Sequence, residues 1–487
     1  MHPHDENLLE PLASFGARLK SGDTISALRG GLVGQDVMID GPFGPRPLVY
    51  ADYVASGRSL LQVEQFVLEH ILPYYANSHT EASYCGGRMT AMRRAARGIV
   101  ARACGARAEH AVIFTGAGAT AGINRLVSLL GADRPDAAGE RAHVIIGPYE
   151  HHSNILPWRE SGAWVTEIAE APDGGPDMAQ LDRVLRGVAG QGRVICAFSA
   201  ASNVTGITTD VAAVTRLAKS HGAAMVWDYA GGGPYLPVSM SAASGCEIDA
   251  IVVSPHKFIG GPAASGVLIV RRDAVVTARP TWPGGGTVRF VSPAHHDYVD
   301  DIEGREEAGT PNVIGDIRAA LAFLVKEAIG EETMRRRNAE LRDRALAAWR
   351  GIDEIELLGH ADAPRLPVFS FRIRDGKGGF VHQQLVTRML SDHYGIQARG
   401  GCACAGPYVH RLLSIDAARS DQMRASILAG EEIAKPGFTR LNLSVLLCDE
   451  KVAFILRSVA ELARQAPRLA ARYDFDSARA VFYPKAA

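Results

Sequence analysis

Ser254-Pro255-His256-Lys257 is the stretch that decides the fold of this chain, together with Asp228 upstream of it. Both charged residues follow apolar runs, at 223–227 and 251–253. Such runs predict two consecutive buried strands, with the acid and the lysine at their ends. A carboxylate keeps a pyridine nitrogen protonated, and a lysine amine forms a Schiff base with an aldehyde. The pair therefore indicates a pyridoxal phosphate (PLP) site, although a surface lysine and a helix-capping aspartate would give the same residues.

The composition is that of an ordinary globular chain of 487 residues, 47% of them apolar and 22% charged. This length suggests about two or three domains. The net charge of −1 provides no field that would recruit nucleic acid or a membrane surface, and we expect neither as a partner. The start of the chain lacks the pattern of a signal peptide, and no apolar run approaches the roughly 20 residues of a membrane span. We expect a cytoplasmic protein.

Short apolar runs alternate with helical patterns in the first part of the chain. This alternation predicts a mostly parallel sheet covered on both faces. We expect an N-terminal arm at 1–48 and a large domain at 49–315. The runs lie at 111–114, 143–147, 194–198, 223–227, 250–253 and 266–270.

Beyond residue 315 the pattern changes, and a smaller α+β domain is expected at 316–487. A long connecting helix is predicted at 317–349 because Ala, Leu, Glu and Arg dominate that stretch. Residues 410–436 show no clean period and are interpreted as a loop or an excursion of unknown role. The other elements expected here are a strand at 366–373, a helix at 382–394, a cysteine-containing loop at 398–408 and a helix near 450–464.

Several strand ends carry residues that suit a cofactor. Residues 114–120 form a glycine-rich turn before a helical stretch, which favours phosphate binding or is simply a structural turn. His151 follows another strand and would stack on a ring or move a proton. His151 and His152 have no third ligand at metal-like spacing, so we expect no metal. Asn203 would hydrogen-bond the ring or serve only as a turn residue before Gly206.

The order of these motifs resembles the class V aminotransferase group of fold-type I PLP enzymes, in its cysteine desulfurase and selenocysteine lyase branch. The resemblance covers roughly residues 49–465. The matching positions are Asp52 with Ala55-Ser56, Asn77-Ser78-His79-Thr80, Gly118-Ala119-Thr120 with Asn124, His151-His152 with Asn154, Ser202-Asn203-Val204-Thr205-Gly206, Asp228, Ser254-Pro255-His256-Lys257, Gly284-Gly285-Gly286-Thr287, Glu307-Ala308-Gly309-Thr310-Pro311-Asn312, Arg399-Gly400-Gly401-Cys402-Ala403-Cys404-Ala405 and Arg440 before Leu441-Asn442-Leu443-Ser444.

This resemblance implies a large domain with a mostly parallel seven-stranded sheet, a smaller α+β domain, and PLP as the cofactor. It implies that Lys257 forms the Schiff base and that Arg440 clamps the carboxylate of a small amino-acid substrate. Thr310 would reach the cofactor phosphate of a second subunit, which implies a homodimer with shared active sites. The cofactor-binding residues would be Ala119, Thr120, His151, Asn203, Asp228, Ser254, His256, Lys257 and Thr310, and the substrate-binding residues Arg440, Asn77, His79 and Arg399.

Cys404 falls where the family places its nucleophilic cysteine, and the resemblance adds it to Lys257 and His151 as a catalytic residue. A thiolate in a mobile, glycine-rich loop suits attack on a substrate sulfur, which would leave a persulfide for a sulfur-acceptor protein. A buried cysteine, or a metal site formed with Cys402, is the plainer alternative. The odd number of seven cysteines does not indicate a disulfide framework.

One departure from the family pattern follows Asp228. Relatives usually carry a glutamine near the ring hydroxyl, whereas this chain has Gly231. The resemblance and the position of Cys404 lead us to expect a PLP-dependent desulfurase-like lyase. The departure after Asp228 keeps two alternatives open. One is an aminotransferase, epimerase or other lyase acting on a non-thiol amino acid, and the other is a non-catalytic PLP-fold protein.

Overall fold

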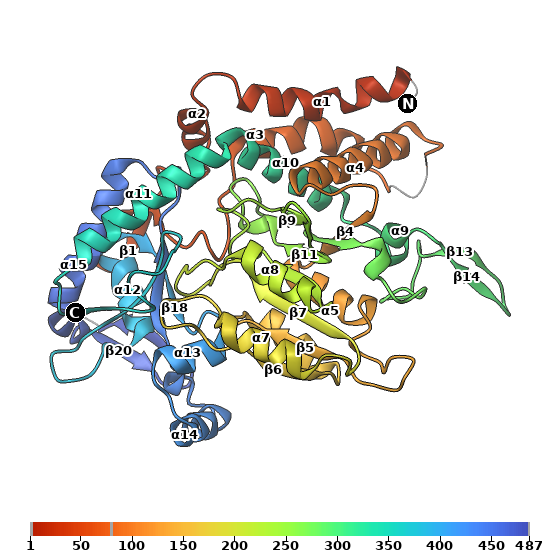
Figure 1. The fold of residues 1–487 in the computed structure, drawn as a ribbon. Helices are drawn as coiled ribbons and strands as arrows, with labels where there is room; N and C mark the ends of the chain where they lie inside the picture. The colour runs from red at the N-terminus through yellow and green to blue at the C-terminus, as the bar shows by residue number, and fades with distance from the viewer. Residues whose placement is uncertain (1–2, 78–80, 486–487) are drawn as a thin grey trace.

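One sheet of seven strands lies at the centre of the first part of the chain (Figure 1). The computed structural model describes residues 3–77 and 81–485. Strand β12 runs antiparallel to both of its neighbours, and every other neighbouring pair is parallel. The mostly parallel sheet expected from the sequence is confirmed. From one edge to the other its strands are β4 (His110–Gly116), β12 (Gly266–Arg271), β11 (Ala250–Val253), β8 (Ala224–Asp228), β7 (Val194–Ser199), β5 (His143–Ile146) and β6 (Trp164–Glu167).

Strand β6 is the one member of this sheet that the apolar runs did not predict. It forms an edge of the sheet, and its first residue, Trp164, is 57% exposed. The other three residues of β6 are only partly buried. An edge strand of this kind needs no continuous apolar run, so the pattern that revealed the central strands is absent here.

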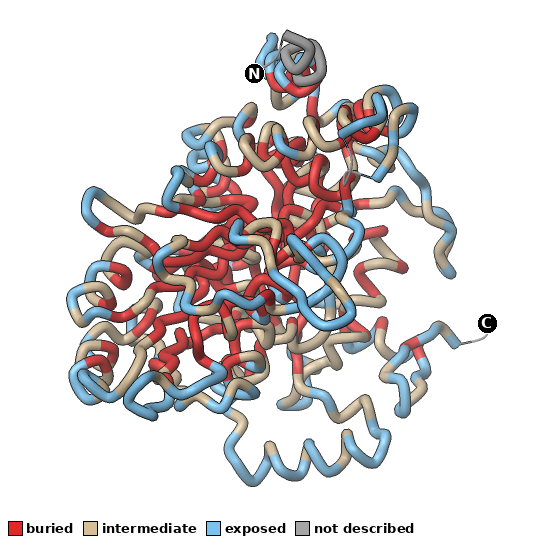
Figure 2. Tube along the Cα trace, turned by 90° about the vertical axis from the view of Figure 1, so that its right-hand side faces the viewer, coloured by how far each residue is buried: buried red, intermediate tan, exposed pale blue. Residues whose placement is uncertain are grey.

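Alternate residues of each central strand face opposite layers of helices. In β4, Val112 and Phe114 join the core beneath α4 (Tyr84–Ala103) and α10 (Val313–Ile329). Ala111 and Ile113 belong to the core on the other face. Figure 2 shows buried residues filling the middle of the molecule. The first face is also covered by α7 (Met178–Gly187) and α8 (Val211–Ser220), and the second by α5 (Gly118–Leu129), α6 (Leu156–Glu160) and α9 (Ile302–Glu306).

The N-terminal segment, expected as an arm, contains helices and a hairpin. Helix α1 (Pro3–Leu19) lies beside α4 and α10 at the top of Figure 1, and Leu12 and Phe15 are buried there. Further along, the hairpin packs against the C-terminal region, so this segment contacts both parts of the molecule. Its other elements are α2 (Thr24–Gly30), β1 (Met38–Gly41) and β2 (Gly44–Pro47).

A second, four-stranded antiparallel sheet organises the C-terminal region as an α+β unit, as expected. Its apolar core includes Trp349, which packs against Phe369 and Phe371 with ring centroids 5.3 and 5.9 Å away. The boundaries drawn at 48/49 and 315/316 stay predictions. In spatial order the strands are β15 (Ile355–Leu357), β16 (Val368–Ile373), β19 (Phe438–Asn442) and β18 (Arg399–Gly401), and the covering helices are α11 (Glu331–Trp349), α12 (Gln383–Tyr394) and α15 (Asp449–Ala470).

The single connecting helix predicted at 317–349 is wrong, because two helices occupy that stretch. Gly330 adopts φ +80°, which ends α10 and begins α11. Residues with a Cβ rarely adopt this conformation, and glycine adopts it readily. Helix-forming residues on both sides of Gly330 hid the break in the sequence pattern.

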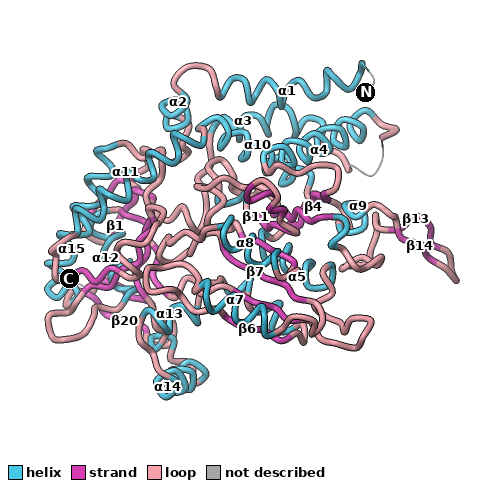
Figure 3. Tube along the Cα trace, viewed as in Figure 1, coloured by secondary structure: helices cyan, strands magenta, loops and turns pink. Residues whose placement is uncertain are grey.

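Of the two interpretations of 410–436, a loop or an excursion, the loop is wrong, because most of the stretch is helical (Figure 3). Helix α13 (Gly406–Leu412) follows the cysteine loop directly, and α14 (Ala417–Leu428) comes next. No residue of α14 is buried, so the helix leaves no apolar period in the sequence. The one sequence feature that indicates this helix is Asp416 at its N-cap. The side chain of Asp416 accepts a hydrogen bond from the backbone N–H of Arg419.

Hairpins complete the fold, and the pair β13 (Val288–Val291) and β14 (His296–Tyr298) extends away from the body at the right of Figure 1. Within the described ranges, no helix is both long and apolar enough to cross a membrane. The remaining elements are β3 (Val49–Tyr50), paired with β17 (Ile396–Gln397), α3 (Leu61–Phe66), β9 (Ser241–Ala243), β10 (Cys246–Glu247), β20 (Tyr473–Asp476), β21 (Val481–Pro484) and short helical turns at Val67–Ile71, Leu72–Tyr74, His152–Asn154, Pro255–Lys257, Arg272–Ala274 and Glu432–Ala434.

Candidate active site

A cavity of about 220 Å³ opens at the carboxyl ends of β7 and β8. Open α/β sheets bind ligands at this edge. Loops of the large sheet line one side of the cavity, and the cysteine loop and β19 line the other. The sequence-predicted residues in its wall are Ala119, Thr120, His151, Asn203, Asp228, Ser254, His256, Lys257, Arg399, Cys404 and Arg440.

Two predicted residues are not brought into this cavity. Asn77 and Thr310 are exposed and do not line it. His79 lies outside the described residues. The predicted roles of Asn77 in substrate binding and of Thr310 at the phosphate of a second subunit stay predictions.

Asp228 and Lys257 stand at the ends of neighbouring parallel strands. Asp228 ends β8, and Lys257 lies in the turn after β11. Burial raises the pKa of Asp228, which is 3% exposed and accepts a hydrogen bond from the N–H of Ala230 at 2.7 Å. Burial also lowers the pKa of Lys257 to about 8, although the charge of Asp228 opposes this shift. A substantial fraction of the lysine amine is thus neutral near pH 8, and the neutral amine is the nucleophile.

An anion cradle lies at the start of α5. Gly118 adopts φ +61°, and a Cβ at this position would lie 2.9 Å from His256 and 3.0 Å from the Oγ of Ser254. The Oγ of Ser254 accepts the backbone N–H of Ala119 at 2.9 Å, and the hydroxyls of Thr120 and Ser153 lie 2.7 Å apart. A helix N-terminus combined with hydroxyl groups suits a phosphate. Glycine is required here because any side chain would fill the cradle.

His151 forms one wall of the cavity as a neutral ring. Burial lowers its pKa to about 3, and the positive charges of Lys257 and its other cationic neighbours act in the same direction. Its Nδ1 accepts the backbone N–H of Ser153 at 3.1 Å, which orients the imidazole. Burial and the charge of Lys257 likewise lower the pKa of His256, to about 4. Both rings are uncharged at neutral pH, and for His151 this favours stacking on an aromatic cofactor.

Arg440 reaches the cavity from β19 and is almost fully buried. Its Nη2 lies 2.7 Å from Oδ1 of Asp52, and its Nη1 donates to the backbone carbonyl of Asn203 at 3.0 Å. The Nε of Arg440 and the Oδ1 of Asn203 are buried without a hydrogen-bond partner among the described residues. Both residues line the cavity, so a ligand bound there would meet an unpaired donor and an unpaired acceptor.

Cys404 lies at the rim of the same cavity on a constrained turn. Ala403 has φ +50° and Cys404 has φ +55°, both in the left-handed region that favours glycine. The described residues contain no group of three or more His, Cys, Asp or Glu side chains arranged to hold a metal ion. Cys404 lines the cavity, whereas Cys402 does not. The two cysteines, which are only two positions apart in the sequence, therefore differ in whether they can contact a ligand in the cavity.

Sequence reasoning missed a buried acid behind the cavity wall. Glu150 is 2% exposed, and burial raises its pKa to about 8. Its Oε1 accepts the N–H of Ser199 at 2.8 Å, and its Oε2 accepts the amide of Asn154 at 2.7 Å. Ser199 and Ser153 line the cavity and were also missed. The available signal was the position of Glu150 immediately before His151, at the end of a predicted strand.

Gly231 occupies the cavity wall where a family glutamine was expected. A Cβ at this position would lie 3.2 Å from the carbonyl oxygen of Ala201 and 3.5 Å from the Cβ of Asn203. The backbone of Gly231 thus packs closely against the segment that holds Asn203. Asn203 also lines the cavity, and its Oδ1 is buried without a hydrogen-bond partner among the described residues.

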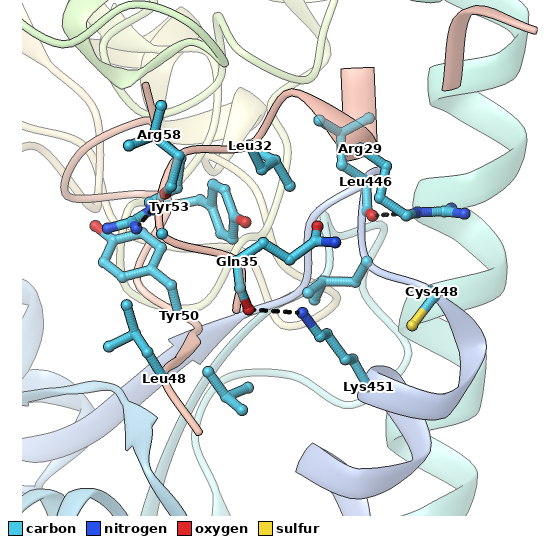
Figure 4. A pocket seen from close by; sticks show the side chains of 14 residues that line it. Arg29, Leu32, Gln35, Leu48, Tyr50, Tyr53, Arg58, Leu446, Cys448 and Lys451 are labelled. Atoms are coloured by element: carbon cyan, nitrogen blue, oxygen red, sulfur yellow. Dashed lines mark hydrogen bonds between the residues drawn. The ribbon is translucent and has the colours of Figure 1, made fainter. Parts of the chain in front are cut away.

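A second cavity, of about 50 Å³, lies between the N-terminal segment and the start of α15 (Figure 4). Its cationic side chains are held by backbone carbonyls. Arg29 donates to Leu446 at 2.9 Å, Lys451 donates to Gln35 at 3.3 Å, and Arg58 stacks on Tyr50. None of the predicted site residues lines it. These contacts join two parts of the chain, and the larger cavity is the candidate active site.

The residues of the larger cavity fit PLP. The glycine cradle suits its phosphate, His151 suits its ring, and Asp228 offers a buried carboxylate to its nitrogen. Lys257 supplies an amine of lowered pKa for its aldehyde. The fold and this cavity define a PLP-dependent enzyme of fold type I.

The chain belongs to the class-V aminotransferase family, whose model matches residues 49–433. Curated relatives include a probable cysteine desulfurase of Vibrio cholerae, 32% identical over 371 residues, covering 74% of this chain and 85% of the relative. A cysteine desulfurase of Klebsiella pneumoniae is 33% identical over 371 residues, covering 75% of this chain and 86% of the relative. These matches confirm the family and the cofactor expected from the sequence.

Solved structures share the fold. A cysteine desulfurase from Thermococcus onnurineus superposes with a TM-score of 0.69 at 25% identity, covering 86% of this chain and 95% of that one. A cysteine desulfurase from Escherichia coli gives a TM-score of 0.71 at 22% identity, covering 91% and 98% of the two chains. The second likeness is evidence of the fold alone.

Proposed function

We propose that this protein is a PLP-dependent cysteine desulfurase, which removes sulfur from L-cysteine, or selenium from selenocysteine, and releases alanine. The observation that supports this most directly is the position of Cys404 in the wall that also contains Lys257 and Arg440. Relatives about a third identical over most of this chain are named cysteine desulfurases. A thiol at this position is needed for sulfur removal and has no role in simple amino-group transfer.

Each cavity residue has a distinct role in the proposed reaction. Arg440 binds the substrate carboxylate through its unpaired Nε, because a guanidinium recognises carboxylates well. Lys257 removes the α-proton, since its lowered pKa makes the neutral amine available. Bound PLP supplies the electron sink that this proton removal requires. His151 would cover one face of the PLP ring, and Asp228 would keep the ring nitrogen protonated.

Cys404 completes the reaction as a nucleophile. Its thiolate attacks the substrate sulfur, so that an S–S bond forms as the bond between the substrate Cβ and sulfur breaks. The electron pair of the broken bond stays with the substrate carbon, which takes a proton and leaves as alanine. The sulfur remains on Cys404 as a persulfide. Incubation with L-cysteine and a reducing thiol tests the proposal: alanine and sulfide in equal amounts are expected, and neither product from PLP-loaded enzyme would refute it.

A second candidate is an aminotransferase, epimerase or other lyase acting on a non-thiol amino acid. Gly231 favours it, because the side chain expected after Asp228 is missing. A screen of amino acids by change in cofactor absorbance separates the two. This candidate predicts a response to a non-thiol amino acid that exceeds the response to cysteine.

We further propose a homodimer with shared active sites and a sulfur-acceptor protein as partner. Thr310 is exposed and away from its own cavity, and the hairpin β13–β14 presents Phe290 and Val291 at 56% and 62% exposure. These features suit contact with a second copy. Helix α14, which has no buried residue and is close in sequence to the cysteine loop, is where we expect the acceptor. The cysteines are free thiols, which suits the reducing cytoplasm.

A further inference from the structure

Three contacts hold the Cys404 turn in its constrained shape, and two of them come from one residue. Nδ2 of Asn203 donates to the carbonyl of Ala403 at 2.8 Å. The backbone N–H of His152 donates to the carbonyl of Cys404 at 2.7 Å. The backbone N–H of Gly406 donates to Nε2 of the same histidine at 2.9 Å. His152 therefore contacts the turn on both sides of Ala405.

The turn needs such support from outside. Two consecutive residues with a Cβ, Ala403 and Cys404, adopt left-handed φ values. Residues in this region persist where surrounding contacts determine their conformation, and they concentrate at functional sites. Without the contacts from Asn203 and His152, the turn would relax and the thiol of Cys404 would move.

We propose that His152 is a positioning residue that fixes the Cys404 turn through the hydrogen bond between its Nε2 and the Gly406 N–H. The inference rests on the proposed role of Cys404 as the nucleophile. His152 does not line the cavity, so it acts on the reaction through the turn and leaves the cofactor contacts to its neighbour His151. Because His151 and His152 are adjacent in the chain, the contact of His152 with the turn also fixes the position of the Cys404 thiol relative to the imidazole of His151.

The ring of His152 must be neutral to accept this hydrogen bond. Nε2 can accept only when it carries no hydrogen, which places the ring hydrogen on Nδ1. Burial lowers the pKa of His152, and the positive charge of Arg159 acts in the same direction. The ring of His151, with its centroid 6.1 Å away, is also neutral because burial lowers its pKa to about 3.

Gly406 offers a way to disturb the contact from its other end. A Cβ built on Gly406 would lie 3.0 Å from Nε2 of His152. The Gly406→Ala variant therefore pushes the ring away without changing His152 itself. The Gly406→Ala variant therefore tests the hydrogen bond alone, because the histidine side chain itself is unchanged.

Two substitutions of His152 form a matched pair. His152→Phe keeps a planar ring of similar size but removes the acceptor, whereas His152→Gln places an amide oxygen within reach of the Gly406 N–H. The first readout is the rate at which iodoacetamide alkylates Cys404, followed by peptide mass spectrometry in the PLP-loaded enzyme. Losing one hydrogen bond should free the turn and speed alkylation about fivefold in His152→Phe, with His152→Gln near the wild-type rate.

The second readout is turnover of L-cysteine. We expect kcat to fall about five- to tenfold in His152→Phe and Gly406→Ala while KM and the cofactor absorbance stay unchanged, because the carboxylate and ring sites are untouched. Equal alkylation rates in wild type and His152→Phe, or a His152→Gln variant as impaired as His152→Phe, would overturn the proposal. If His152→Phe does not fold, Gly406→Ala decides in its place.

The two readouts also separate this inference from the proposed function. Alkylation needs no turnover, so it tests the hydrogen bond even if cysteine is not the substrate. Wild-type enzyme that forms no alanine would refute the desulfurase assignment and leave the alkylation series to decide the role of His152.

Discussion

Arg440 and Asp52 form an ion pair inside the cavity wall, with Nη2 of the arginine 2.7 Å from Oδ1 of the aspartate. The two side chains are 3% and 15% exposed. Arg440 lies on β19, whereas Asp52 follows β3, so the pair joins distant parts of the chain. A substrate carboxylate that binds the guanidinium of Arg440 must either share it with Asp52 or displace Asp52 from it.

The Asp52→Asn variant tests this competition. We expect a lower KM for the amino-acid substrate, because the guanidinium loses its internal counter-charge and becomes freer to bind the incoming carboxylate. We also expect the free energy of unfolding to fall by about 2 kcal/mol, since a hydrogen bond to a buried charge is weakened. Steady-state kinetics and urea unfolding measure the two effects. Asp36→Asn, at an exposed aspartate of the same segment, should change neither, and a raised KM in Asp52→Asn would contradict the competition.

The pH dependence of stability tests the burial of Lys257. Its folded pKa of about 8 lies below its ordinary value of 10.5, so the unfolded chain binds more protons between these two values. Stability of the cofactor-free protein should therefore rise with pH in this window through this group, and the burial cost is fully present below pH 8. Lys257→Met should remove that rise. Parallel stability profiles for the two cofactor-free proteins from pH 8 to 10 would show that Lys257 is not buried as described.

Glu150 should act in the opposite direction. Its folded pKa of about 8 lies above its ordinary value of 4.5, so the folded protein holds the extra proton between these values. Its contribution to stability is present below about pH 4.5 and is lost as the pH rises toward 8. We expect Glu150→Gln to flatten this decline, as measured by urea unfolding from pH 5 to 8. Glu160→Gln, at an exposed position nearby, should keep the wild-type slope.

The exposed hairpin gives a prediction about assembly. Replacing Phe290 and Val291 by aspartate should shift the protein from dimer to monomer and weaken PLP retention, because charges oppose an apolar contact and Thr310 would lose its partner site. Sedimentation velocity and cofactor absorbance after dialysis measure the two effects. Leu428→Asp on α14, also at a highly exposed apolar residue, should leave the dimer intact. A monomeric wild-type protein with full activity would contradict the shared-site proposal.

Much of the fold and site could be predicted because the central strands are buried on both faces. Their apolar runs located the strand ends, and Asp228 and Lys257 stand at those ends. Features that depend on an edge or on the surface were hidden, such as β6 and α14. The break between α10 and α11 depends on the conformation of Gly330 within helix-forming sequence.

Contacts between distant segments could also not be predicted from the sequence. The pairing of Arg440 with Asp52 and of His152 with Gly406 requires residues separated by hundreds of positions to meet. Arg440, Asp52 and His152 belong to recognisable motifs and Gly406 directly follows one, but no spacing within a motif shows which atoms touch. The predicted role of Thr310 involves a second copy of the chain, and it stays a prediction.

The most direct test of the central claim compares Cys404→Ser with Cys402→Ser for alanine formation from L-cysteine. The two cysteines lie in the same loop, yet only Cys404 lines the cavity. We expect Cys404→Ser to lose turnover by at least about a hundredfold while retaining PLP, as removal of a nucleophile does, and Cys402→Ser to stay near wild type. Unimpaired alanine formation by Cys404→Ser would contradict the account.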